Sequence, residues 1–499
     1  MRVLLIQPAP FEDRRLGLEN SIWLSEPLAL MSVAAMLPDC EVVILDMRLE
    51  EPQALPRTLA QFKPDIVGTT AMTTDAYQAQ AVLRVARTLC PNALTMIGGH
   101  HCTMLPSFYH QEYVDVIVKG EGEHTLRELV DAWSEMLQNG GSHDSTVLKD
   151  VLGIELRLPD GTYVTNEKRP DSDLDALPRP NRELITDYKG KYFFLAAQPM
   201  ASIYTSRGCS FDCNFCAIWE FYDRRTRFLS AKNIVDRMEA CEEPFVFFLD
   251  DNFLSRTDRL VALADELERR GVKKWWMSQG RVDFIAKNPD LIARLAKVGM
   301  MGILSGYESN DADALAALKK RSSLEYNRKA AEILRENGIV STGIFMVRPD
   351  FEEKDFEALY EYILELGVAV PLVTIWTPLP GTQLYREQHD RLLTKDYRLY
   401  DLLHSVVPTK LPREEFYKNY VKWEAISDQC RKNWFQRDTL RKRWRFYLRV
   451  LPRLPQTIFR LRRYRKIQYD YRSYLRDEKG IITQNHPFPA TPDQSKAAK

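Results

Sequence analysis

Short apolar runs alternate with longer amphipathic stretches through the first quarter of the chain. Apolar runs of about four residues predict strands, and stretches with apolar positions every three or four residues predict helices. Because the runs show no polar alternation, each strand is expected to be covered on both faces, as in a parallel doubly wound sheet. The predicted strands are 3–6, 42–45, 66–69, 94–97 and 116–118, and the predicted helices are 28–37, 55–62, 76–89 and 125–137.

A second series of apolar runs and helical stretches begins near residue 200. Small or polar residues follow its predicted strands directly. Six βα units with polar residues at the carboxyl ends of their strands predict an open barrel, with the functional site at that end. The predicted strands are 202–205, 245–249, 275–278, 302–305, 340–347 and 373–376, and helices at 259–270 and 324–337 are among those that separate them.

The segments outside these two series are less regular. Residues 156–158 and 163–165 flank the turn sequence Pro159, Asp160 and Gly161, which predicts a β-hairpin. The region after about 400 is charged and aromatic and is expected to be helical, and the proline-containing end is expected to be disordered. The predicted fold class is α/β, with a first domain over 1–138, a connector over 139–195, a second domain over 196–400, a helical region over 401–483 and a disordered tail over 484–499.

Composition narrows the class of protein. The chain has 499 residues, of which 45% are hydrophobic and 28% charged, and its formal net charge is zero, as is typical of a globular protein. Eight cysteines without a recognisable signal peptide favour a reducing compartment. The sequence has no run of 18 apolar residues, so it predicts no membrane-spanning helix. We therefore expect a cytoplasmic protein.

One segment departs from this balanced charge. Residues 431–466 contain 14 Lys or Arg and a single acidic residue, Asp438, with aromatic and aliphatic residues between them. A basic helix of this composition can lie on the surface of an anionic membrane. It can equally be the solvated basic face of a helix that packs on its own protein, or contact another anionic partner.

Three cysteines, Cys209, Cys213 and Cys216, lie in one short stretch with the spacing Cys-x3-Cys-x2-Cys. Soft thiolates select iron–sulfur clusters or zinc over hard cations. Three thiolates can hold three corners of a cubane cluster and leave the fourth iron open for a substrate. Zinc usually needs a further Cys or His nearby, and no His lies between residues 144 and 388. A half-occupied zinc site and buried structural cysteines are the alternatives.

The cysteine loop follows the first predicted barrel strand, carries Phe215 before its last cysteine, and comes after a doubly wound domain. In these features the chain resembles the cobalamin-binding branch of the radical S-adenosylmethionine (SAM) superfamily. The resemblance implies a Rossmann-like cobalamin-binding domain over 1–138 and a partial (β/α)6 radical SAM barrel over 196–400. It also implies that Cys209, Cys213 and Cys216 ligate a 4Fe–4S cluster whose open iron binds SAM.

The same resemblance implies SAM contacts at the strand ends of the barrel. Asp250 and Asp251 stand where many members carry a Gly-Gly-Glu stretch near the methionine amine. Arg281 is placed to pair with the methionine carboxylate, and Glu308 to accept hydrogen bonds from the ribose hydroxyls. For Arg281 and Glu308 the alternative is an ordinary surface salt bridge.

In the first domain the resemblance implies a cobalamin site at the strand ends. Thr73 and Thr74 would face the corrin ring. The residues that would enclose its nucleotide tail are Gly98, Gly99, His100, Gly120, Glu121, Gly122 and Glu123. The motif Asp-x-His-x-x-Gly, whose His coordinates cobalt in related domains, is absent, because residues 7–17 contain no His. We therefore predict cobalt without a protein imidazole ligand.

The implied chemistry is methyl transfer to an unactivated carbon: the reduced cluster cleaves SAM to a radical that abstracts hydrogen, and methylcobalamin supplies the methyl group. We assign no catalytic acid or base, since such a carbon requires none. Segments 16–27, 45–49 and 402–412 resemble the hopanoid C-3 methylases, which implies a small lipid substrate. The second candidate in this class resembles the anaerobic magnesium-protoporphyrin monomethyl ester cyclases.

The expected partners follow from this interpretation. A flavodoxin or ferredoxin would donate the electron, and we expect no nucleic-acid partner. The basic segment 431–466 would allow peripheral contact with the inner face of the membrane.

Overall fold

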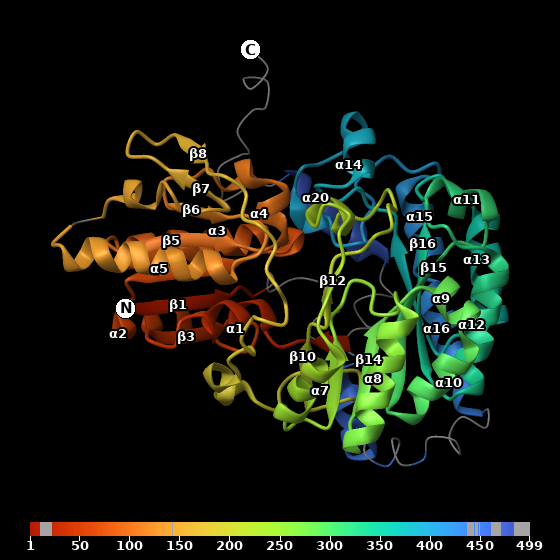
Figure 1. Cartoon of the computed structure of the whole chain (residues 1–499). Helices are drawn as coiled ribbons and strands as arrows, with labels where there is room; N and C mark the ends of the chain where they lie inside the picture. The colour runs from red at the N-terminus through yellow and green to blue at the C-terminus, as the bar shows by residue number, and fades with distance from the viewer. Residues whose placement is uncertain are drawn as a thin grey trace.

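The computed structural model describes residues 1–9, 22–141, 143–436, 444, 448, 450–460 and 471–483. These residues form two large, mainly parallel sheets, each covered by helices. Figure 1 shows the two sheets in separate halves of the molecule, red to yellow on one side and green to cyan on the other. The predicted α/β class with two domains of this kind is confirmed.

The first sheet has the strand order β3-β1-β4-β5-β6-β7-β8. Its first five members are parallel, and their order is that of flavodoxin-like sheets, in which ligands bind outside the carboxyl ends of the strands. The strands are β1 (Arg2–Gln7), β3 (Glu41–Asp46), β4 (Ile66–Thr70), β5 (Leu94–Gly98), β6 (Val116–Val118), β7 (Ile154–Arg157) and β8 (Tyr163–Thr165).

Helices cover both faces of this sheet, as the uninterrupted apolar runs predict. One face packs against α1 and α5 and the other against α2 and α3. The short helix α4 follows β5 directly. The bounds are α1 (Leu28–Ala34), α2 (Ala54–Phe62), α3 (Ala76–Leu89), α4 (His100–Met104) and α5 (Glu123–Gln138).

The predicted hairpin forms, but it belongs to the first sheet. β7 pairs antiparallel with β6, and β8 pairs with β7, so the sheet continues beyond residue 138 into the segment expected to be a connector. The hairpin covers the edge of β6, which would otherwise expose unpaired backbone groups. The sequence predicts the hairpin from its turn residues but contains no signal for the strand that it pairs with.

The second sheet contains six parallel strands in sequential order, β10-β13-β14-β15-β16-β17. Among the described residues β10 and β17 do not pair with each other, so the barrel is open. Its strands are β10 (Met200–Ile203), β13 (Phe245–Phe248), β14 (Trp275–Gln279), β15 (Met300–Glu308), β16 (Val340–Val347) and β17 (Val370–Ile375). Its helices are α7 (Ala231–Ala240), α8 (Thr257–Arg270), α9 (Val282–Lys287), α10 (Pro289–Lys297), α11 (Ala312–Ala317), α12 (Leu324–Glu336) and α13 (Glu353–Leu366).

Large apolar side chains fill the amino-terminal end of the barrel. Met200, Phe245, Phe247, Met277 and Met301 form one buried cluster there. The small sheet of β2 (Trp23–Leu24) and β9 (Phe193–Phe194) packs against this cluster, with the rings of β2 and β13 5.3 Å apart. Because this end is filled by protein side chains, the carboxyl ends of the strands remain for a ligand.

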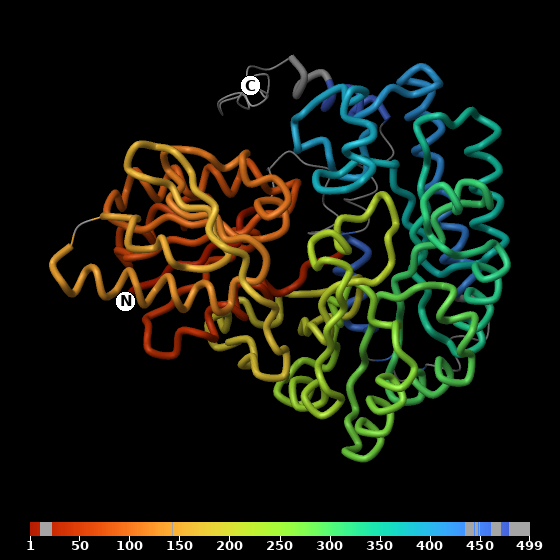
Figure 2. Tube along the Cα trace, turned by 45° about the horizontal axis from the view of Figure 1, so that its top comes forward, coloured from red at the N-terminus to blue at the C-terminus, as the bar shows by residue number. Residues whose placement is uncertain are grey.

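The C-terminal region is helical, as predicted, in the part that the structure describes. It contains α15 (Arg413–Tyr420), α16 (Trp423–Gln436) and α20 (Tyr471–Thr483). The preceding segment, with α14 (Gln383–Glu387) and the 3-10 helix η7 (Tyr397–Leu399), contacts the first domain. Figure 2 shows this cyan segment beside the loops at the carboxyl ends of the first sheet. The predicted tail 484–499 lies outside the described residues.

Candidate functional site

The cysteine loop begins where β11 (Ser206–Arg207) ends, just after the first barrel strand. β11 pairs antiparallel with β12 (Arg227–Phe228), so both ends of the loop are held. Gly208 makes the turn with φ +90°, and a Cβ at this position would lie only 2.1 Å from the carbonyl oxygen of Arg225. Only glycine fits at this turn.

Burial raises the pKa of all three loop cysteines, that of Cys216 to about 12. Cys213 is buried, and Cys209 and Cys216 are half-buried. Their thiols therefore hold their protons until a metal displaces them, as is usual when metal binding is coupled to proton release. A soft, three-thiolate donor set on one loop fits a 4Fe–4S cluster.

A cubane cluster gives each of these thiolates its own iron, so the three need not converge on one point. In the described part of the chain, no three His, Cys, Asp or Glu side chains lie close enough to share a single metal ion. Trp219 stabilises the loop, because its indole Nε1 donates a hydrogen bond to the carbonyl oxygen of Cys213 at 3.0 Å.

The two aspartates after β13 have different surroundings. Asp250 is fully buried and accepts hydrogen bonds from the Thr205 amide and the Ser206 hydroxyl, both at 2.6 Å, with Arg259 3.6 Å away. Its carboxylate is thus occupied by the residues that lead into the cysteine loop. The structure therefore gives Asp250 protein partners, and the predicted contact with SAM stays a prediction.

Asp251 reaches the loop itself. It accepts a hydrogen bond from the Gly208 amide at 3.1 Å, and burial raises its pKa to about 6. Among the two predicted aspartates, Asp251 is the one whose side chain adjoins the turn before Cys209. The contact of Asp251 with the methionine amine of SAM stays a prediction.

Arg281, predicted to bind the methionine carboxylate, packs against the cysteine loop. Its guanidinium carbon lies 3.6 Å from the centre of the Phe211 ring, and its Nε donates to Asp283 at 2.8 Å. It also donates to the carbonyl oxygens of Lys320 and Arg321. These contacts fix the loop against α9, and the predicted contact with SAM stays a prediction.

Glu308 ends β15 beside the same loop. Its φ of +61° is the left-handed conformation, which is unusual for a non-glycine residue and is often found at functional sites. Lys320 donates to its carboxylate at 2.6 Å and lies 6.0 Å from the ring of Phe215. A side chain at Gly306 would collide with this pair. Sequence reasoning missed Lys320, because no motif surrounds it.

Replacing Glu308 with alanine is expected to weaken SAM binding by roughly 10- to 100-fold, since a hydrogen bond to a charged group contributes about 1.5–3 kcal/mol. Titration calorimetry of the cluster-loaded protein measures this. Glu332→Ala, an exposed position on α12, is the matched control and should bind SAM as the wild type does. An unchanged affinity in the Glu308 variant would remove this residue from the SAM site.

At the first sheet, the carboxyl ends of β4, β5 and β6 face the barrel domain. Met72 follows β4 and exposes 54% of its surface, and a Cβ at Gly120 after β6 would meet nothing within 4 Å. Thr73 is buried in the short 3-10 helix η2 (Thr73–Asp75), and Thr74 lies beside it. An exposed apolar side chain and open space at strand ends fit a large ligand such as cobalamin.

The two histidines near this edge are held differently. His100 stacks on Phe221, with the centres of the two rings 5.5 Å apart, and Phe221 lies just after the cysteine loop. His101 is fully buried with its Nδ1 2.8 Å from the Tyr109 hydroxyl, and burial lowers its pKa to about 3. Gly98 and Gly99 precede them at the strand end. The predicted absence of an imidazole ligand to cobalt stays a prediction.

Glu121 and Glu123 bind arginines across the domain boundary. Arg207 lies 3.1 Å from Glu121 and forms an ion pair with Glu123, and Arg227 forms an ion pair with Glu121. Burial alone would raise the pKa of Glu121, but Arg227 and Arg207 lower it overall. Both carboxylates therefore have arginine partners, and their predicted contact with cobalamin stays a prediction. The intervening Gly122 lets α5 approach Val33 of α1.

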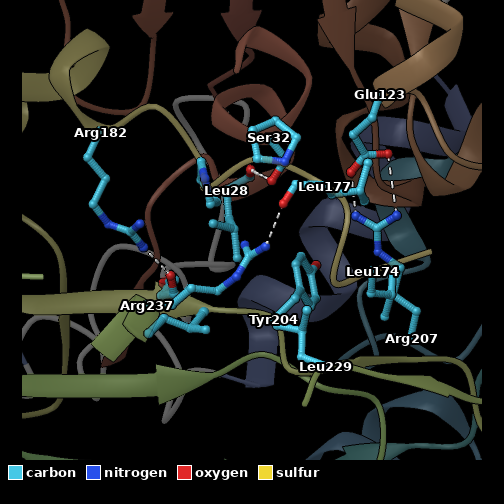
Figure 3. Close-up of a pocket in the computed structure, with 14 residues that line it drawn as sticks. Leu28, Ser32, Glu123, Leu174, Leu177, Arg182, Tyr204, Arg207, Leu229 and Arg237 are labelled. Carbon is cyan, nitrogen blue, oxygen red and sulfur yellow. Dashed lines mark hydrogen bonds and ion pairs between the residues drawn. The ribbon is translucent and has the colours of Figure 1, made fainter. Parts of the chain in front are cut away.

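A small cavity lies beside these ion pairs, between α1 and the first strand of the barrel. Figure 3 shows the pair of Arg207 and Glu123 at its wall, with Tyr204, Arg182 and Arg237 nearby. Its volume of about 30 Å³ admits about two water molecules, not a nucleoside. Waters there would satisfy buried Nε atoms of Arg182 and Arg237, which have no protein partner.

The second domain is a partial barrel with three thiolates on its first loop and charged residues at the next strand ends. Ion pairs join it to a flavodoxin-like sheet. This arrangement is that of an iron–sulfur enzyme with a second cofactor domain. Comparison with known families agrees. The B12 binding domain family matches residues 24–130, and the Radical SAM superfamily matches residues 203–363. The chain is a B12-binding radical SAM enzyme, with a 4Fe–4S cluster, SAM and cobalamin as its cofactors.

Individual proteins resemble most of the chain. The hopanoid C-3 methylase of Methylococcus capsulatus is 29% identical over 88% of this chain and 83% of its own. The anaerobic magnesium-protoporphyrin IX monomethyl ester cyclase of Rubrivivax gelatinosus is 28% identical over 72% of this chain and 64% of its own. The structure of the cobalamin-dependent SAM radical enzyme OxsB, with aqua-cobalamin and SAM bound, shares the fold with a TM-score of 0.65 at 16% identity, over 97% of this chain and 82% of its own.

Proposed function

We propose that this enzyme transfers a methyl group to an unactivated carbon, and that its substrate is a hopanoid lipid methylated at C-3. The observation that carries the proposal is the similarity to the hopanoid C-3 methylase, which covers 88% of this chain.

The residues of the chain have defined tasks in this proposal. Cys209, Cys213 and Cys216 hold the cluster, and Asp251 and Glu308 adjoin the loop where SAM would bind. When bound, the cluster with SAM supplies a carbon radical, and cobalamin supplies the methyl group. The ion pairs of Arg207 with Glu121 and Glu123 fix the two cofactor domains against each other. A flavodoxin or ferredoxin would reduce the cluster.

The reconstituted enzyme is expected to methylate a hopanoid deuterated at C-3 and to transfer that deuterium to 5′-deoxyadenosine. Mass spectrometry of both products measures this, and the Cys213→Ala variant is the control without a cluster. Deletion of the gene should also remove 3-methylhopanoids from an organism that makes them. An unchanged methylhopanoid profile would contradict the lipid assignment while leaving the enzyme class intact.

The second candidate is a cyclase or oxidase of the kind that acts on magnesium-protoporphyrin monomethyl ester. The similarity to the Rubrivivax gelatinosus cyclase supports it, although the match covers less of both proteins. The two functions differ in product, since the cyclase reaction adds oxygen from water rather than a methyl group. Incubation of the same enzyme with the porphyrin ester in ¹⁸O-labelled water separates them.

A further inference from the structure

We propose that the exposed apolar side chains among the described residues of 444–459 form a docking surface for an anionic lipid bilayer. Six large apolar side chains in this segment are exposed, between 36% and 69% of their surface: Trp444, Leu448, Leu451, Leu454, Ile458 and Phe459. The described residues expose 15 large apolar side chains in total, so two fifths of them lie within 16 positions. Such a concentration marks an interaction surface rather than scattered surface residues.

The spacing of these side chains places them on one face. Successive members are separated by four, three, three and four residues from Trp444 to Ile458, which is the period of a helix. Residues 444, 448, 450 and 454–460 are α-helical, and Leu451–Arg453 form the short 3-10 helix η8 between them. A helical stripe of tryptophan, leucine, isoleucine and phenylalanine has the composition of a helix that lies in the interface of a membrane.

The opposite side of the segment is fixed to the protein, and this holds the apolar stripe outward. Val450 is buried in the apolar cluster at the amino-terminal end of the barrel. Thr457 is buried, and its hydroxyl lies 3.4 Å from the carbonyl oxygen of Leu195. Arg460 places its guanidinium 3.5 Å from the centre of the Phe193 ring. The described residues of this segment are therefore anchored to the protein at Val450, Thr457 and Arg460 and expose the apolar side chains between these anchors.

The positive charge of the surrounding sequence favours an anionic bilayer as the partner of this surface. Residues 431–466 contain 14 Lys or Arg and one acidic residue, while the chain as a whole is neutral. Each basic residue close to an anionic bilayer strengthens attachment, and the apolar stripe adds insertion between the headgroups. A second copy of this chain would bring two such basic segments together, and the repulsion opposes that arrangement. The aliphatic members of the stripe have no counterpart in base stacking on nucleic acid.

The position of the surface keeps the active end free. Val450 packs with residues that begin the barrel strands, whereas the cysteine loop follows the end of the first one. Docking through this segment therefore leaves the carboxyl end of the barrel and the facing first sheet uncovered. No helix among the described residues is long and apolar enough to cross a membrane. The proposal concerns attachment alone and holds whichever molecule is methylated.

Flotation of the full-length, cluster-loaded protein with vesicles tests this surface. We expect binding to phosphatidylcholine vesicles that contain phosphatidylglycerol, little binding to phosphatidylcholine alone, and a steep fall with added salt. The combined variant Leu451→Ser, Leu454→Ser, Ile458→Ser and Phe459→Ser should bind roughly 100-fold more weakly. The matched control replaces two exposed leucines elsewhere, Leu89→Ser and Leu393→Ser, and should bind as the wild type does.

Three further measurements make the result unambiguous. Iron content and circular dichroism show whether the fourfold variant is folded. The Cys213→Ala variant should still bind vesicles, so loss of enzyme activity and loss of docking are separable. The proposal is overturned if the wild type ignores anionic vesicles, if the folded fourfold variant binds them equally, or if light scattering shows a lipid-free dimer that the fourfold variant dissociates.

Discussion

Replacing Cys213 with alanine is expected to leave the protein unable to hold its iron–sulfur cluster and to abolish cleavage of SAM. Cys213 is the most buried of the three loop cysteines, and its Sγ lies 3.8 Å from the carbonyl oxygen of Lys319. A cubane held by two thiolates has lost one of its three protein ligands and exposes two irons. Because the open iron is where SAM binds, loss of the cluster removes the radical chemistry entirely.

Iron and sulfide analysis after anaerobic reconstitution measures the first effect, with about four irons expected for the wild type and few for the variant. Release of 5′-deoxyadenosine measures the second. Cys241→Ala is the matched control, because Cys241 is also buried but lies on the helix side of the barrel. Four irons in the Cys213 variant would contradict the assignment of this residue as a ligand.

Replacing Asp250 with alanine is expected to destabilise the barrel domain by about 3–5 kcal/mol, the usual cost of removing one partner of a buried charged network. Asp250 has no exposed surface and accepts from Thr205 and Ser206, and Arg259 pairs with it. Burial raises its pKa and lowers that of Arg259, so the pair persists only through its hydrogen bonds. Its removal leaves a buried guanidinium and several donors without an acceptor.

The neighbouring Asp251 provides the contrast. Asp251 accepts a backbone hydrogen bond from Gly208 at the turn, and burial raises its pKa, which disfavours its charged form. Asp251→Ala should therefore change stability little and lower the affinity for SAM. Urea unfolding followed by tryptophan fluorescence measures stability, and calorimetry measures affinity. A stable Asp250→Ala variant with weak SAM binding would reverse the two roles.

The strands and helices could be predicted because their periodicity is local. All five parallel strands of the first sheet and all six of the second lie within a few residues of their predicted positions, since uninterrupted apolar runs occur where both faces are covered. The cysteine spacing also lies within one loop, so the cluster could be predicted without a fold. The pairing of β7 with β6 could not, because it depends on an open edge distant in the sequence.

The partners of individual charged residues were the least predictable feature. Asp250 and Asp251 are adjacent in sequence, yet one is buried under the start of the loop and the other adjoins it. Glu121 and Glu123 follow a strand end, where a cofactor contact was expected, and bind Arg207 and Arg227 from the other domain. Nothing near these residues in the sequence indicates which partner they take, because that partner lies about a hundred positions away.

The sequence by itself therefore determined the class of the enzyme, through the three cysteines and the two α/β series, which are patterns within short stretches. Only the tertiary structure decided which partner each carboxylate takes and which apolar side chains between residues 444 and 459 are exposed. The physical reason is that a side chain's charge and polarity are local properties, whereas its burial and its partners depend on segments brought together by folding.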